Sequence, residues 1–151
     1  MTIRNRATSL GAAFALVLAA GCVSVDRPPQ AAAAKAAGPN RIVMQVSDSE
    51  PAKWNLALNN ARNIQSDLGA KNVEIEIVAY GPGIGMLKNG SAVAQRIDEA
   101  TLSGVKVVAC ENTMHAQKLT KADMTSGIAY VPAGVVEIMK RQQEGWSYIR
   151  P

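Results

Sequence analysis

The sequence is poor in aromatic residues, cysteine and histidine, and each scarcity excludes a class of protein. Aromatic side chains make up 4% of the 151 residues, too few for the base-stacking surface of a single-stranded nucleic-acid binder. Two cysteines exclude a disulfide-stapled scaffold. One histidine, with no other ligands at a metal-binding spacing, gives no support for a metal site, and we expect no cofactor. With 48% hydrophobic and 19% charged residues, the chain has the composition of one folded domain.

The first 21 residues have the pattern of a secretory signal peptide. Arg4 and Arg6 supply a positive start, and an apolar segment follows at residues 10–20. About eleven apolar residues are too few to cross a bilayer, which needs about 20. We therefore expect residues 1–21 to be removed on export.

The end of this segment predicts a lipid anchor. Residues 18–22 read Leu-Ala-Ala-Gly-Cys, and small residues before a cysteine resemble the bacterial lipobox, in which the thiol receives a diacylglyceryl group. Cys22 is then the lipidation site, and the membrane is contacted through this anchor alone. Val23 follows where enteric lipoproteins that stay in the inner membrane have Asp, so the expected location is the periplasmic side of the outer membrane. The alternative is an ordinary cleavage site beside an incidental cysteine.

The mature chain is nearly neutral. Loss of residues 1–21 removes two arginines and no acid, which leaves 14 basic and 12 acidic residues and no footprint for a nucleic acid. Residues 22–40 are rich in alanine and proline without apolar periodicity, so we interpret them as a flexible tether. The folded domain is expected over residues 41–151.

Strand and helix patterns alternate through the folded part. Short apolar runs predict strands, and apolar residues at three- and four-residue steps predict helices. The expected strands are 42–46, 73–80, 105–110, 128–131 and an edge strand 146–149. One expected helix ends at 68, and three others cover 91–102, 112–119 and 132–144. Such alternation with short connections predicts a three-layer α/β/α sandwich around a mostly parallel sheet of about five strands.

Cys110 is the strongest candidate for chemistry. It ends a buried strand and directly precedes a helix that Asn112 or Thr113 can cap, so free backbone N–H groups and the helix dipole favour its thiolate. His115, in the following turn, is a weaker supporting candidate, whereas the carboxylate of Glu111 opposes a second anion. This hypothesis requires a sulfur atom that solvent can reach. The alternative is a buried, inert cysteine.

Cysteine counting limits the chemistry. If Cys22 is acylated, Cys110 is the single thiol of the mature chain, and a dithiol oxidoreductase mechanism is excluded. A persulfide carrier, a mixed disulfide, a sulfenate or no chemistry remain.

Other motifs are interpreted as structural. The glycines at 81, 83 and 85 match neither the Rossmann nor the Walker pattern, so we expect a tight turn, with an anion contact as the alternative. Glu74 and Glu76 are expected on the solvated half of a strand. Trp146 and Tyr148, two residues apart, are expected in the core or an interface.

Several segments resemble the DsrE/DsrF/YchN-like family. The strand and helix around the cysteine (Val-Lys-Val-Val-Ala-Cys-Glu-Asn-Thr-Met-His-Ala-Gln-Lys-Leu, 105–119) carry the resemblance, together with residues 43–60, 78–83, 130–137 and 143–149. The likeness covers the whole folded part.

The resemblance implies a compact α/β/α domain assembled as a homo-oligomer, a trimer or hexamer. It also implies that Cys110 carries sulfur as a persulfide between a donor and an acceptor protein, neither of which the sequence identifies. Two features depart from the sulfur-relay members, which are cytoplasmic and in some cases have a second cysteine soon after the first: this chain has an export signal, and 111–119 lack a cysteine. The alternative function is a non-enzymatic periplasmic binding or assembly module in which Cys110 is structural.

Overall fold

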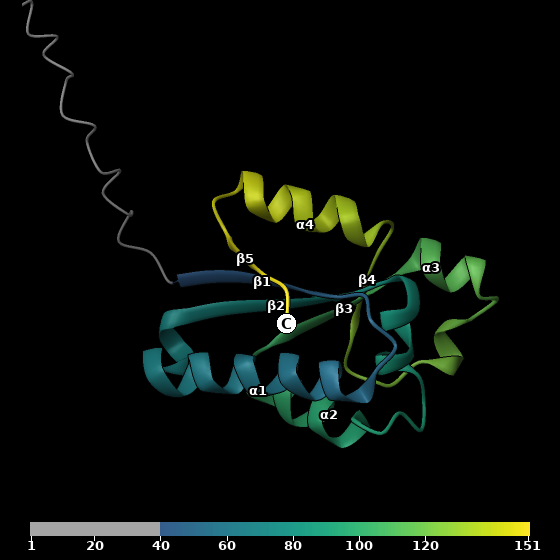
Figure 1. Cartoon of the computed structure of the whole chain (residues 1–151), viewed down its shortest axis with the longest axis horizontal. Coiled ribbons are helices and arrows are strands. Elements are labelled where there is room, and N and C mark those ends of the chain that lie inside the picture. The colour runs from purple at the N-terminus through teal and green to yellow at the C-terminus, as the bar shows by residue number, and fades with distance from the viewer. Residues whose placement is uncertain (1–39) are drawn as a thin grey trace, which may run out of the picture. The chain divides into compact units, whose positions relative to one another are not determined.

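The computed structural model describes residues 40–151, which form a parallel sheet flanked by helices (Figure 1). The strands are β1 (Asn40–Val46), β2 (Val73–Ala79), β3 (Lys106–Cys110), β4 (Ala129–Val131) and β5 (Ser147–Ile149). The helices are α1 (Pro51–Leu68), α2 (Ala94–Leu102), α3 (Glu111–Ala116) and α4 (Gly134–Gln143). Three 3₁₀ helices lie at Ala70–Asn72, Gly81–Leu87 and Lys121–Asp123.

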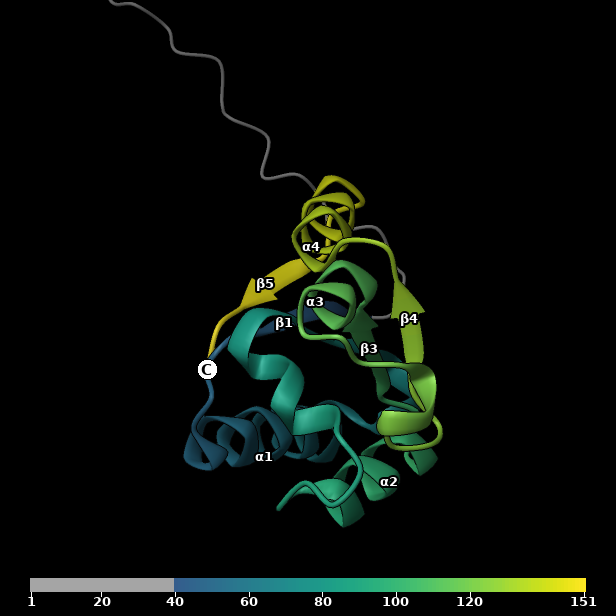
Figure 2. The same ribbon diagram turned by 90° about the vertical axis from the view of Figure 1, so that its right-hand side faces the viewer.

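The sheet has the order β4-β3-β2-β1-β5, and all its strand pairs are parallel. Helices α1 and α2 cover one face and α4 covers the other, while α3 follows the carboxyl end of β3 (Figures 1 and 2). The predicted α/β/α arrangement with five strands is confirmed, and β5 is an edge strand as expected.

The side chains of the strands divide between two cores. The larger core, under α1 and α2, includes Met44, Ile77 and Val107 from the three central strands. The smaller core, under α4, includes Val43, Val78 and Val108 from the same strands and Ile138 from the helix. Alternate residues of a strand point to opposite faces, so a sheet covered on both sides has strands that are apolar almost throughout.

The segment after β2 is a 3₁₀ helix, where the sequence predicts a turn. Gly83 in this helix packs against β1, because a Cβ placed there would lie 2.6 Å from the carbonyl carbon of Val46 and 2.9 Å from Cα of Ser47. A Cβ at Gly85 would lie 3.3 Å from the indole ring of Trp54. The glycines at these two positions therefore permit close packing against β1 and α1.

Helix α4 begins two residues later than predicted, and most of its apolar side chains are exposed. Ile138 is buried, whereas Val135, Val136 and Met139 are 58%, 40% and 48% exposed. The physical reason is that the one helix packed on this face of the described chain can turn only one stripe toward the sheet. Leu68, an apolar residue at the end of α1, is also exposed.

Glu76 is fully buried, contrary to the expectation that it lies with Glu74 on a solvated half-strand. Its carboxylate lies beneath α4, 2.8 Å from Arg141 and 3.3 Å from Lys106. Arg141 also pairs with Glu137 at 2.9 Å. Because the partner that covers Glu76 is 65 residues away in the sequence, a strand pattern alone does not reveal the burial.

The described residues include the predicted boundary between the tether and the folded domain. Asn40, expected as the last residue of the tether, is the first residue of β1. No helix in residues 40–151 is long and apolar enough to cross a membrane. The predicted signal peptide, lipidated Cys22 and residues 22–39 of the tether lie outside the described residues.

Candidate thiol site

Cys110 lies where β3 ends and α3 begins. It is the last residue of the strand, and Glu111 is the first residue of the helix, one residue earlier than predicted. Two residues before it, Val108 belongs to the core under α4, so by strand alternation Cys110 also faces α4. The sulfur atom therefore lies beside the start of two helices, its own α3 and the more distant α4.

Donor groups of both helices lie near this sulfur atom. Burial raises the pKa of the Cys110 thiol, but the Thr113 hydroxyl and the neighbouring backbone N–H groups, first that of Gly134, outweigh it. The pKa is therefore lowered below its ordinary value, because such groups stabilise the thiolate. That the free N–H groups of α3 favour the thiolate stays a prediction, since the Cys110 side chain makes no capping hydrogen bond to them.

Thr113 is oriented by a contact with the 3₁₀ helix after β2. The N–H of Gly81 donates to Oγ1 of Thr113 at 3.0 Å, and Nε2 of Gln117 donates to the carbonyl of Gly81 at 3.3 Å. Because Oγ1 of Thr113 accepts from Gly81, its own O–H hydrogen is directed elsewhere. The Thr113 hydroxyl lowers the pKa of the Cys110 thiol, so the segment after β2 is connected to the thiol site through Thr113.

Gly134 brings the start of α4 close to the sheet. A Cβ there would lie 3.1 Å from Cβ of Tyr80 and 3.2 Å from Cγ1 of Val78. The absence of a side chain therefore lets the start of α4 approach the end of β2, and the N–H of Gly134 is among the groups that lower the pKa of Cys110. The strand that precedes it is held to α3, since the N–H of Asn112 donates to the carbonyl of Pro132 at 3.1 Å.

The sulfur atom is closed off from solvent. Cys110 is only 5% exposed, so the expectation of a sulfur that water reaches freely is wrong for the described chain. A reagent therefore needs a local displacement of the surrounding structure to reach Cys110.

The other predicted site residues contribute unequally. The N-cap of α3 is Cys110, so neither Asn112 nor Thr113 caps the helix as expected, and the Cys110 side chain makes no capping hydrogen bond. The backbone N–H of Asn112 donates to the carbonyl of Pro132. His115 is exposed on α3, and it is not among the groups that shift the pKa of Cys110. Glu111 faces Lys121, with 3.8 Å between its Oε1 and Nζ, so its charge is partly compensated.

Sequence reasoning missed Gly134 and Gly81 as parts of the site. Both act through backbone atoms, which carry no residue-type signature. The available signal was position: each follows the carboxyl end of a parallel strand, and such ends meet at one edge of the sheet.

No metal centre is found at this edge or elsewhere in the described chain. Within residues 40–151, no three His, Cys, Asp or Glu side chains lie close enough together to hold an ion.

The comparisons with known proteins identify the family and the fold. The DsrE/DsrF-like family matches residues 40–151. A solved structure of MTH1491 from Methanobacterium thermoautotrophicum, described as a protein of unknown function, is 37% identical and covers 74% of this chain and 99% of its own, with a TM-score of 0.71. No curated protein matches the chain.

Two more distant structures show the same fold. BT1422 from Bacteroides thetaiotaomicron, also of unknown function, is 16% identical over 74% of this chain and 95% of its own, with a TM-score of 0.60. The ychN protein from E. coli is 12% identical over 76% of this chain and 99% of its own, with a TM-score of 0.56.

Proposed function

The chain belongs to the DsrE/DsrF-like family, and we propose that it carries sulfane sulfur as a persulfide on Cys110. The family is associated with sulfur relay. The observation that supports the proposal most directly is the position of Cys110 at the end of β3 and the start of α3, where neighbouring donor groups lower the pKa of its thiol.

The transfer step balances without an added oxidant. The thiolate of Cys110 attacks the terminal sulfur of a donor persulfide, a new S–S bond forms, the S–S bond of the donor breaks, and the donor leaves as a thiolate. The reverse step passes the sulfur to an acceptor thiolate. In this proposal the donor and acceptor are proteins that displace the segment around Gly134 when they dock.

Mass spectrometry of the intact protein tests the proposal. In the full chain carrying Cys22→Ser, Cys110 is the single thiol; incubation with a low-molecular-weight persulfide is expected to add one sulfur atom, about 32 Da. The matched Cys22→Ser, Cys110→Ser chain is expected to gain nothing. Equal gain by both chains, or no gain by either, overturns the proposal.

The 5% exposure of Cys110 favours a second candidate function. According to this second candidate function, the chain is a non-enzymatic periplasmic binding or assembly module, and Cys110 is a packing residue. Alkylation of the native Cys22→Ser chain separates the two functions. A sulfur carrier is expected to react in the folded state at a rate that rises with the thiolate fraction, whereas a packing cysteine reacts only after denaturant unfolds the chain.

The proposal places the protein in the periplasm, held to the outer membrane by acyl chains on Cys22. Its support is the pattern of the first 22 residues. Fractionation of cells tests it: the full chain is expected in the membrane fraction, and the Cys22→Ser chain is expected to leave that fraction. Retention of the variant in the membrane contradicts the anchor.

We further propose that the protein assembles as a homo-oligomer, a trimer or hexamer as the family resemblance implies. The exposed apolar side chains of α4 support this, since Val135, Val136 and Met139 form a patch of the kind that subunit contacts cover. Tyr148 of the edge strand, 41% exposed, is a further large exposed side chain.

A further inference from the structure

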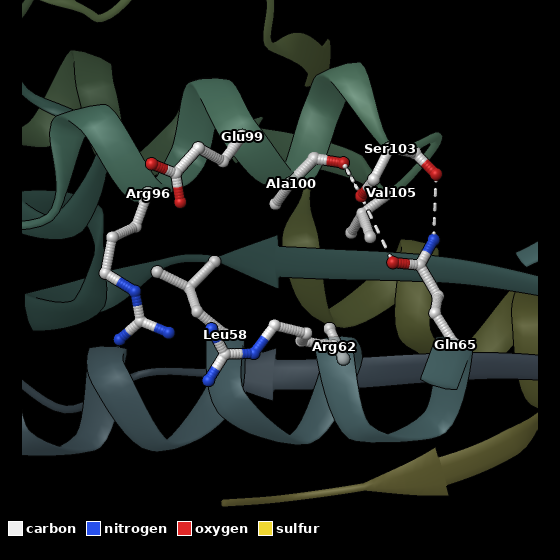
Figure 3. Close-up of a pocket in the computed structure, with 9 residues that line it drawn as sticks. Leu58, Arg62, Gln65, Arg96, Glu99, Ala100, Ser103 and Val105 are labelled. Carbon is white, nitrogen blue, oxygen red and sulfur yellow. Dashed lines mark hydrogen bonds between the residues drawn. The ribbon is translucent and has the colours of Figure 1, made fainter. Parts of the chain in front are cut away.

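A small cavity lies between α1 and α2 (Figure 3). These two helices cover the sheet face opposite the one that Cys110 faces (Figure 1). Its volume is about 150 Å³. An apolar cavity of this size accommodates a body of about six carbon atoms, such as benzene. Nothing in the thiol chemistry uses it, so it is a separate site.

The floor of the cavity is apolar. Leu58 and Ala61 of α1 and Val105 before β3 line it, and each is at most 3% exposed. Ala100 of α2 completes the lining between the two helices. A ligand with an aliphatic or aromatic body would bury apolar surface against these groups, which favours binding.

Two arginines reach the same cavity, and neither has an acidic partner among residues 40–151. Arg96 of α2 donates to neutral oxygens of α1, those of Asn55 and the side chain of Asn59, the latter at 2.7 Å. These contacts hold the guanidinium group in place without neutralising its charge. Figure 3 shows the guanidinium groups of Arg96 and Arg62 both extending beside Leu58.

The remaining polar groups limit the charge of a ligand. Gln65 and Ser103 bond to each other across the helices: Nε2 of Gln65 donates to the Ser103 carbonyl at 2.8 Å, and Oγ of Ser103 donates to Oε1 of Gln65 at 3.1 Å. The carboxylate of Glu99 also lines the cavity, and it accepts from Gln95 at 3.2 Å. Two cations and one anion leave a surplus of one positive charge.

We propose that this cavity binds a small monocarboxylate with an apolar body of about six carbon atoms. Its carboxylate pairs with the guanidinium groups of Arg62 and Arg96, which present planar donors of matching geometry. Its body lies against Leu58, Ala61 and Val105. Glu99 disfavours a ligand with a second negative charge.

Calorimetric titration of the full chain with hexanoate tests the proposal. We expect saturable binding, and binding of the isosteric neutral hexanamide at least about tenfold weaker, because the charge-assisted hydrogen bonds are lost. Equal affinity for the two compounds, or no saturable binding of hexanoate, overturns the proposal.

Variants of α1 and α2 locate the binding. Arg62→Gln and Arg96→Gln are each expected to weaken hexanoate binding by about tenfold or more. Lys53→Gln, which removes a charge from the exposed start of α1, is the matched control and is expected to leave the affinity unchanged. Ala100→Leu fills the cavity and is expected to abolish binding while the chain stays folded by circular dichroism. Undiminished binding by Arg62→Gln and Ala100→Leu contradicts the assignment.

Discussion

At the scale of single residues, the environment of Cys110 combines two properties that usually exclude each other. A buried thiol ordinarily stays protonated, because low polarity disfavours the thiolate. Here the hydroxyl of Thr113 and neighbouring backbone N–H groups compensate for the burial, and the pKa of Cys110 is lowered. The sulfur atom is therefore both covered and poised for ionisation.

Thr113→Val removes the hydroxyl donor while preserving the shape of the side chain. The pKa of Cys110 is expected to rise, and the rate of its alkylation at neutral pH to fall by about tenfold, because a hydrogen bond to a charged group is lost. The pH dependence of alkylation in the Cys22→Ser background measures both effects. Thr113→Ser keeps the hydroxyl and is expected to react like the parent chain; a slow Ser variant attributes the effect to packing instead.

Glu76 is a second buried ionisable residue. Burial raises the pKa of its carboxyl, opposed by Lys106 and Arg141, and the nearby carboxyl of Glu137 raises it further. Arg141 remains charged, since its pKa is raised as well: burial lowers it, but its acidic neighbours outweigh that effect. Glu76 is thus a member of this cluster that binds its proton more tightly in the folded chain than in the unfolded chain.

The stability of the protein is expected to carry the signature of Glu76. Because its pKa in the folded chain lies above the ordinary value of 4.5, the unfolded chain loses this proton at lower pH. The contribution of Glu76 to stability is therefore complete below pH 4.5 and declines as the pH rises through the raised value. Urea unfolding measures this: the stability of the parent relative to Glu76→Gln is expected to fall between acidic and neutral pH. A parent that gains on the variant with rising pH contradicts the assignment.

At the scale of elements, the contact between β1 and the 3₁₀ helix Gly81–Leu87 positions one side of the thiol site. The helix packs on Val46 through Gly83 and supplies the N–H of Gly81 to Thr113. Displacement of this helix would therefore reach Cys110 through Thr113.

Gly83→Ala is expected to destabilise the protein by about 2 kcal/mol or more, because the new Cβ meets the backbone of β1 and no flexible side chain can move aside. Gly90→Ala is the matched control: its φ of 75° is strained for alanine, but no atom lies within 4 Å of the new Cβ. A cost of about 1 kcal/mol is expected there. Denaturant unfolding of the two variants compares them, and equal losses contradict the packing role of Gly83.

The elements themselves could be predicted, and their boundaries and partners only in part. Apolar runs and helical spacing locate all five strands and four helices, because those patterns arise from local geometry. The burial of Glu76, the exposure of Val135 and the arrival of Gly134 at Cys110 depend on which segments the fold brings together. Cys110 itself was identifiable because its position between strand and helix is local.

At the scale of the whole molecule, the exposed face of α4 is the surface on which the proposed assembly depends. Val135, Val136 and Met139 lie on the helix whose first residue, Gly134, is among the groups that lower the pKa of Cys110. Subunit contacts on this face would therefore lie close to the thiol.

The double variant Val135→Glu, Met139→Glu is expected to lower the molar mass of the protein in solution to that of the monomer. Both side chains are exposed in the single chain, so the folded subunit tolerates the charges, whereas an apolar contact between subunits does not. Light scattering after size-exclusion chromatography measures the mass. Leu102→Glu, at an 89% exposed position of α2, is the control and is expected to leave the assembly intact. A parent chain that is itself monomeric contradicts the proposed assembly.

The two outermost strands of the sheet, β4 and β5, contribute only three residues each. They offer a foreign strand very little unpaired backbone, and the chain reaches Pro151, which has no N–H to donate, two residues after β5 ends. Growth of the sheet by addition of further strands is thereby discouraged at either margin. In the proposed assembly, copies of this domain are therefore expected to recognise each other through side chains, on surfaces that selection can adjust one residue at a time.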